Sequence, residues 1–153
     1  MTDILPATKE YSRIRDNQMS IFENYARKNG MQSKALTILM WIYYNPNGIT
    51  QQRITRKTYS TKQVVNATIK NFKDKGYIFF EENPEDKRTK VIKLTEDGRT
   101  YASSILDALE AAENAAMKEL TVEEQDVLLR ASEKFTTALA RHIEEQRERQ
   151  VKQ

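Results

Sequence analysis

The side chains best suited to chemistry lie in the middle of the 153-residue chain, where amide and basic groups recur along one segment. Residues 62–70 read KQVVNATIK, and Val65 and Ile69 repeat at helical spacing, which predicts one apolar helix face. Amide side chains can pair with the N6 and N7 edge of adenine, lysines reach guanine acceptors or phosphates, and valine can contact a thymine methyl group. The other face therefore has the chemistry to read bases in a DNA major groove through Lys62, Gln63, Val64, Asn66 and Lys70. Taken alone, such a face is more typical of the solvated side of an ordinary amphipathic helix.

A second polar segment, NPEDKR at residues 83–88, separates two runs that are rich in aromatic and β-branched residues, 77–81 and 90–94. This pattern predicts a β-hairpin with a charged tip. An arginine at such a tip suits the negative potential of a narrow minor groove, although Asp86 and Arg88 can instead pair to stabilise the turn. The residues that we assign to this tip are Asp86, Lys87, Arg88 and Lys90, and the candidate phosphate contacts elsewhere are Thr50, Arg53, Ser60 and Thr61.

The positive charge is confined to this middle third of the chain. Residues 49–93 contain eleven Lys and Arg against five Asp and Glu, a net charge of +6, whereas the remaining residues carry 14 basic and 17 acidic groups, a net charge of −3. A basic module between near-neutral flanks favours double-stranded DNA as the partner.

Other function classes lack the residues that they need. The chain has no cysteine, which excludes thiolate metal sites, disulfides and thiol switches. Its single histidine, His142, stands in a charged helical run, and the acidic pairs at 81–82 and 123–124 have no partner base. We therefore expect no enzyme, cofactor or metal. With no secretory signal and no apolar run near the roughly 20 residues of a membrane span, we expect a cytoplasmic protein.

Periodicity and capping signals define the elements that position these groups. We expect helices over about 9–28, 33–44, 50–57, 60–75, 95–117 and from 121 past 143, and strands at 77–81 and 90–94. Either Ser60 or Thr61 caps the fourth helix, and Thr121 with Glu124 forms a capping box for the last. Residues 147–153 are expected to be a frayed polar tail.

The predicted fold is mainly α with a small β-wing, in a single unit over 1–153. Its winged helix-turn-helix occupies 33–94, with two short helices joined by a tight turn and followed by the hairpin. The long helices at 9–29 and 95–146 carry apolar stripes that such a small core cannot cover. We therefore expect these N- and C-terminal helices to form a homodimer.

The order of elements and the hairpin residues resemble the MarR family of bacterial transcriptional regulators. In that family an Asp-x-Arg is followed, after five intervening residues, by Leu-Thr-x-x-Gly, and Asp86, Arg88, Leu94, Thr95 and Gly98 stand at those positions, after Pro84 and Glu85. The resemblance is strongest over residues 35–98. The chain departs from it at Tyr59, where the family often has glycine, and at Ser60, where an apolar residue is usual.

The resemblance implies a sequence-specific regulator, in most cases a repressor released by a small ligand, that binds an inverted-repeat operator as a homodimer. An aromatic or anionic ligand would then lie between the DNA-binding module and the dimer helices. Aromatic and methionine side chains available for that pocket are Tyr11, Met19, Phe22, Met40, Trp41, Tyr44 and Tyr101, although such residues at helical spacing are more often core. The alternative is a non-enzymatic winged helix that docks a protein and has no DNA specificity.

Overall fold

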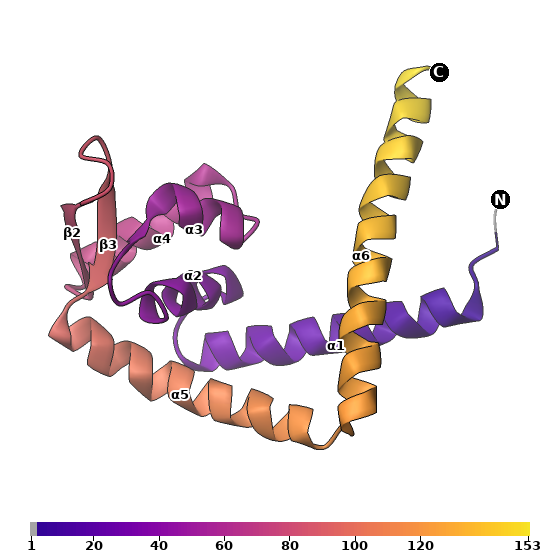
Figure 1. Ribbon diagram of the computed structural model, residues 1–153, viewed down its shortest axis with the longest axis horizontal. Coiled ribbons are helices and arrows are strands. Elements are labelled where there is room, and N and C mark those ends of the chain that lie inside the picture. Colours follow the sequence, from indigo (N-terminus) through magenta and orange to yellow (C-terminus); the bar gives the residue numbers. More distant parts are fainter. Residues whose placement is uncertain (1–2) are drawn as a thin grey trace. The chain divides into compact units, whose positions relative to one another are not determined.

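A computed structural model of the chain describes residues 3–153 (Figure 1). Its elements are α1 (Pro6–Lys28), α2 (Ser33–Tyr43), β1 (Ile49–Thr50), α3 (Gln51–Lys57), α4 (Lys62–Asp74), β2 (Ile78–Glu82), β3 (Lys90–Leu94), α5 (Glu96–Lys118) and α6 (Val122–Val151). The chain forms two compact units, residues 1–108 and 109–153, and the boundary between them falls within α5. The mainly helical fold with a small β-wing that the sequence predicts is thus confirmed.

Helix α2 is the centre of the first unit, as its almost continuous apolar sequence predicts. It packs against α1, α4 and β3. Leu36, Ile38 and Leu39 are completely buried, and Ile54 of α3 and Val65 of α4 are equally inaccessible. Because the two helices of the helix-turn-helix are anchored to this core by such residues, their opposite faces are held in fixed positions at the surface.

The wing belongs to a three-stranded antiparallel sheet with the strand order β1-β3-β2. β2 and β3 pair from Ile78 opposite Leu94 to Glu82 opposite Lys90, so β2 lies one residue further along the chain than predicted. β1 is not predicted by any sequence pattern, because two residues carry no periodicity. Ile49 pairs with Ile92 and is buried, so this short strand ties the wing to the beginning of α3.

Side-chain caps fix the two helices on either side of the turn. The Thr50 hydroxyl accepts from the Arg53 backbone N–H at 3.2 Å, and the Thr61 hydroxyl accepts from the Val64 N–H at 3.2 Å. Thr61, rather than Ser60, is therefore the cap of α4. Between the helices Tyr59 adopts a φ of 52°, a left-handed conformation that favours glycine, so the turn has this conformation without a glycine.

The junction between the wing and α5 is closed by hydrogen bonds around Thr95. Its backbone N–H donates to the Tyr77 carbonyl at 3.0 Å, and its hydroxyl donates to the Gly76 carbonyl at 2.6 Å and accepts from the Gly98 N–H at 3.0 Å. A Cβ atom on Gly98 would lie 1.9 Å from the Tyr77 carbonyl oxygen. The Leu-Thr-x-x-Gly pattern thus has a physical basis, since only glycine allows α5 to approach this carbonyl.

Residues 109–153, described by themselves, contain the end of α5 and all of α6. The predicted capping box is present, because the Thr121 hydroxyl accepts from the Glu124 N–H and the Glu124 carboxylate accepts from the Thr121 N–H. Helix α6 runs to Val151, so the predicted frayed tail from residue 147 is wrong: the run of helix-favouring Glu, Gln and Arg continues the helix. In residues 3–153 we find no helix with the length and apolar character that membrane crossing requires.

Candidate nucleic-acid interface

Helix α4 presents the predicted base-reading face to solvent. Its apolar face, which includes Val65 and Ile69, is buried against the core, and this arrangement turns the other face outward. Val64 has an apolar side chain, yet 39% of its surface is exposed to solvent. All five residues that the sequence assigns to this face are accessible: Lys62, Gln63, Val64, Asn66 and Lys70.

One neighbour of this face was missed by the sequence analysis. Gln51, the first residue of α3, donates from its side-chain Nε2 to the side-chain Oδ1 of Asn66 on α4. Gln51 is half-buried, whereas Asn66 is exposed. No sequence signal marks this pair, since the residues are fifteen positions apart and meet only because the two helices cross.

The wing tip is an ordered loop that holds Arg88 away from the protein. The Arg88 Nε atom lies 3.0 Å from Asp86 Oδ1, and its Nη2 atom lies 3.3 Å from Asp86 Oδ2, while 90% of the arginine side chain remains exposed. Asn83 donates from Nδ2 to the Thr89 hydroxyl at 2.9 Å and closes the base of the loop. The Arg88 guanidinium and then its backbone N–H lower the pKa of Asp86, so the carboxylate stays charged and orients the arginine.

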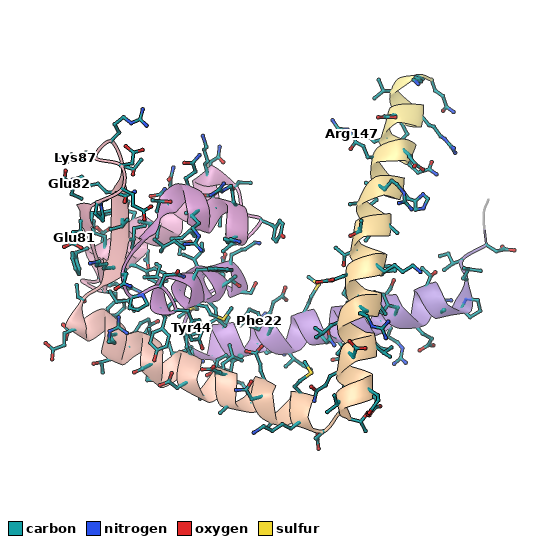
Figure 2. The ribbon with its side chains drawn as sticks, in the orientation of Figure 1. Phe22, Tyr44, Glu81, Glu82, Lys87 and Arg147 are labelled. Atoms are coloured by element: carbon teal, nitrogen blue, oxygen red, sulfur yellow. The ribbon has the colours of Figure 1, made fainter. Side chains whose placement is uncertain are left out.

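Lys87 and Lys90 are further exposed cations of the wing. Figure 2 shows Lys87 at the tip of the hairpin, while Glu81 and Glu82 lie along β2. The Glu81 carboxylate lies 2.5 Å from the Lys93 ammonium group, so much of its negative charge is neutralised within the sheet. Residues 83–88 carry Lys87 and Arg88 against Glu85 and Asp86, so the tip offers exposed cations but has a net charge of zero.

The predicted phosphate contacts differ in whether their side chains can still donate a hydrogen bond to a phosphate. Thr50 and Thr61 use an acceptor lone pair for capping, which leaves each O–H free to donate to a phosphate. Arg53, on the first turn of α3, is exposed. Ser60, in contrast, is half-buried, and its hydroxyl lies 2.7 Å from that of Thr58, so it is engaged within the turn.

Two of the seven residues predicted to line an effector pocket share a groove on the surface. Met19 and Phe22 share an open groove of about 370 Å³ with Lys34 and residues of α1 and α2. Tyr101 instead stacks on Tyr77 at the base of the wing, with ring centroids 4.3 Å apart. Figure 2 shows Phe22 on α1 and Tyr44 at the end of α2. The groove is not lined by Tyr11, Met40, Trp41, Tyr44 or Tyr101.

Acidic and histidine side chains do not assemble into a metal site in the described part of the chain. No group of three or more such residues within 3–153 is arranged to hold an ion. The strongest cluster of functional groups is therefore the polar surface of α4 with the adjoining wing.

Comparison with known proteins identifies the module. Residues 29–89, which run from the end of α1 to the wing tip, match the family model described as MarR family. This part of the chain is similar to the MarR family. A MarR family regulator from Neisseria meningitidis has the same fold, with 17% identity, a TM-score of 0.77, and 92% of this chain and 99% of that chain covered. No protein of curated function matches the sequence.

Two further similar structures are of MepR from Staphylococcus aureus. MepR in a complex with DNA is 18% identical over 89% of this chain and 99% of its own, with a TM-score of 0.69. MepR in its DNA-binding conformation is 18% identical over 88% and 99%, with a TM-score of 0.73. At these identities the likeness establishes the winged helix-turn-helix fold, while the function of individual residues depends on the geometry described above.

Proposed function

We propose that this protein is a MarR family regulator of transcription, without enzymatic activity, that binds double-stranded DNA through α4 and the wing. The observation that supports this most strongly is the exposed, Asp86-oriented guanidinium of Arg88, on the same unit as an exposed helix face with two lysines and two amides. In this arrangement α4 enters the major groove, where Gln63 and Asn66 contact bases. Arg88 enters the adjacent minor groove.

The test is selection of bound duplexes from a random DNA pool by the full-length protein, followed by binding measurements over a range of salt concentrations. If each half of a dimer neutralises about four phosphates, the slope of log affinity against log salt is about −7. A slope near zero, with no recovered sequence, would refute DNA binding and favour the protein-docking alternative.

Two arginine variants sharpen this test. Arg88→Ala removes the wing contact and should weaken binding to the selected duplex by about tenfold or more. Arg13→Ala is the matched control, because Arg13 is also exposed and also pairs with a nearby carboxylate, that of Glu10, but lies on α1. Equal affinities of both variants would contradict a wing contact.

We further propose that the protein acts as a homodimer on an inverted repeat with half-sites about one helical turn apart. Helix α6 has no buried residue, and its exposed apolar side chains include Val127, Leu139 and Ile143, with exposed fractions of 55%, 39% and 57%. A helix face of this kind is stabilised by a second copy. Sedimentation equilibrium of Ile143→Glu should show dissociation, whereas Thr137→Glu, with the same charge on another face of α6, should stay dimeric.

We also propose that the protein is a repressor and that a small aromatic or anionic ligand relieves the repression. The groove beside Met19 and Phe22 is the described cavity that includes two of the predicted pocket residues. Thermal-shift measurements with a panel of phenolic and fatty acids test it. Stabilisation of the wild type that is lost in Phe22→Ala supports ligand control, and no stabilisation by any compound would count against it.

A further inference from the structure

The side-chain amide of Asn66 is held by a residue outside the recognition helix. Gln51 Nε2 donates to Asn66 Oδ1, and both backbones are fixed. Thr50 caps α3 immediately before Gln51, and Val65, completely buried, precedes Asn66. The contact thus joins two rigid elements and is formed before any DNA arrives.

We propose that Gln51 is a positioning residue that sets which way Asn66 presents its amide to the bases, and so sets the base that Asn66 selects. This inference rests on the proposed DNA-binding function. An asparagine amide has a donor end and an acceptor end, and a half-turn about its last bond exchanges them. The hydrogen bond from Gln51 fixes the acceptor end toward α3.

The hydrogen-bonding groups of Asn66 that Gln51 does not use determine which base Asn66 prefers. One Oδ1 lone pair is used by Gln51, which leaves the second lone pair and both Nδ2 hydrogens. Adenine offers a donor at N6 and an acceptor at N7, which match this remaining set. Because the orientation is fixed beforehand, binding does not have to order the amide, and the reversed orientation is disfavoured.

Gln52 provides a matched control for Gln51. It is the same residue type in the same helix, it is exposed, and it follows Gln51 directly. Any general effect of shortening a glutamine near the start of α3 should appear equally in both alanine variants. A difference between them therefore reports the contact with Asn66.

The experiment measures dissociation constants of the full-length protein for a duplex selected by the wild type from a random pool. Each half-site position is replaced symmetrically by the other three base pairs. Asn66→Ala should lose discrimination at one base pair, and Gln51→Ala should lose about tenfold of the discrimination at that same pair. Gln52→Ala should retain it, and the double variant of Gln51 and Asn66 should match Asn66→Ala.

Gln51→Glu gives a second, independent variant. A carboxylate can only accept, so Asn66 must turn its Nδ2 toward it and reverse the amide. Preference for adenine at that base pair should then be lost. Ratios of affinities between duplexes cancel the uniform weakening that a new negative charge causes.

Several results would overturn the proposal. If Gln51→Ala weakens binding to every duplex by the same factor, Gln51 is a backbone contact. If discrimination changes at another base pair, or if the effects of the Gln51 and Asn66 variants add, the two residues act separately. If the wild type selects no sequence at all, the proposed DNA-binding function is wrong. If the wild type is selective and Gln51→Ala keeps that selectivity, only the proposed role of Gln51 is wrong.

Discussion

Replacing Gly98 by alanine tests how the wing is attached to α5. Gly98 is buried in the first turn of that helix, where alanine is ordinarily favoured by about 1 kcal/mol. Here the added Cβ would lie 1.9 Å from the Tyr77 carbonyl oxygen. Ordinary contacts between carbon and oxygen begin at about 3.3 Å, so α5 and Tyr77 must separate by more than about 1 Å.

This displacement breaks identifiable interactions. The two hydrogen bonds that Thr95 donates to the carbonyls of Gly76 and Tyr77 contribute about 1 kcal/mol each. The stacked pair of Tyr77 and Tyr101 contributes about 1 kcal/mol more. After the gain in helix propensity is subtracted, Gly98→Ala should lower the free energy of unfolding by about 2 kcal/mol.

Urea denaturation at one fixed protein concentration measures this change, and the melting temperature should fall by about 4–8 °C. Thr100→Ala is the control, because Thr100 is exposed in the same helical turn and its replacement should leave stability within about 0.5 kcal/mol. A Gly98→Ala protein as stable as the wild type would refute the reasoning, since helix propensity would then outweigh the contact.

Three further perturbations have defined outcomes. Thr121→Ala removes the hydroxyl that caps α6 through Glu124 and should lower unfolding free energy by about 1 kcal/mol in urea, whereas Thr121→Ser should retain it. The pKa of Asp86 is lowered in the folded protein, so the stability that its pairing with Arg88 contributes is present above the unfolded pKa. That stability is lost as the pH falls through the folded pKa. In Arg88→Ala, NMR titration should show a higher Asp86 pKa. Tyr59→Gly should raise unfolding free energy by about 0.5–1 kcal/mol by removing left-handed strain, while Tyr59→Ala, which keeps the strain and loses only an exposed ring, should change little.

The fold was predictable because its signals are local. The continuous apolar sequence of α2, the capping residues Thr50 and Thr121 and the hairpin pattern each depend on neighbouring residues, and the structure contains all of these elements. The end of α6 differs from the prediction because a polar sequence does not by itself cause fraying. Helix propensity there favours continuation to Val151.

The surface of α4 was predictable for the same reason, since burial of Val65 and Ile69 determines which side chains face outward. The gathering of the seven aromatic and methionine residues into one pocket stays a prediction of a different kind, because it depends on how separate elements pack. Tyr101 illustrates the difficulty: its helical spacing is compatible with a pocket, but its ring is stacked on Tyr77, a residue of another element.

The contact between Gln51 and Asn66 shows what sequence patterns leave out. Its geometry depends on the crossing of α3 and α4, and that crossing depends on the turn at Tyr59, where the chain takes a left-handed conformation without glycine. A preference for one base can therefore depend on three separate residues: one that faces the groove, one that orients it, and one that sets the angle between their helices. Substitutions at Tyr59 that alter the turn should then change base discrimination at the position read by Asn66 even though Tyr59 contacts no base, and measurement of Tyr59→Pro on the same duplex series would test that dependence.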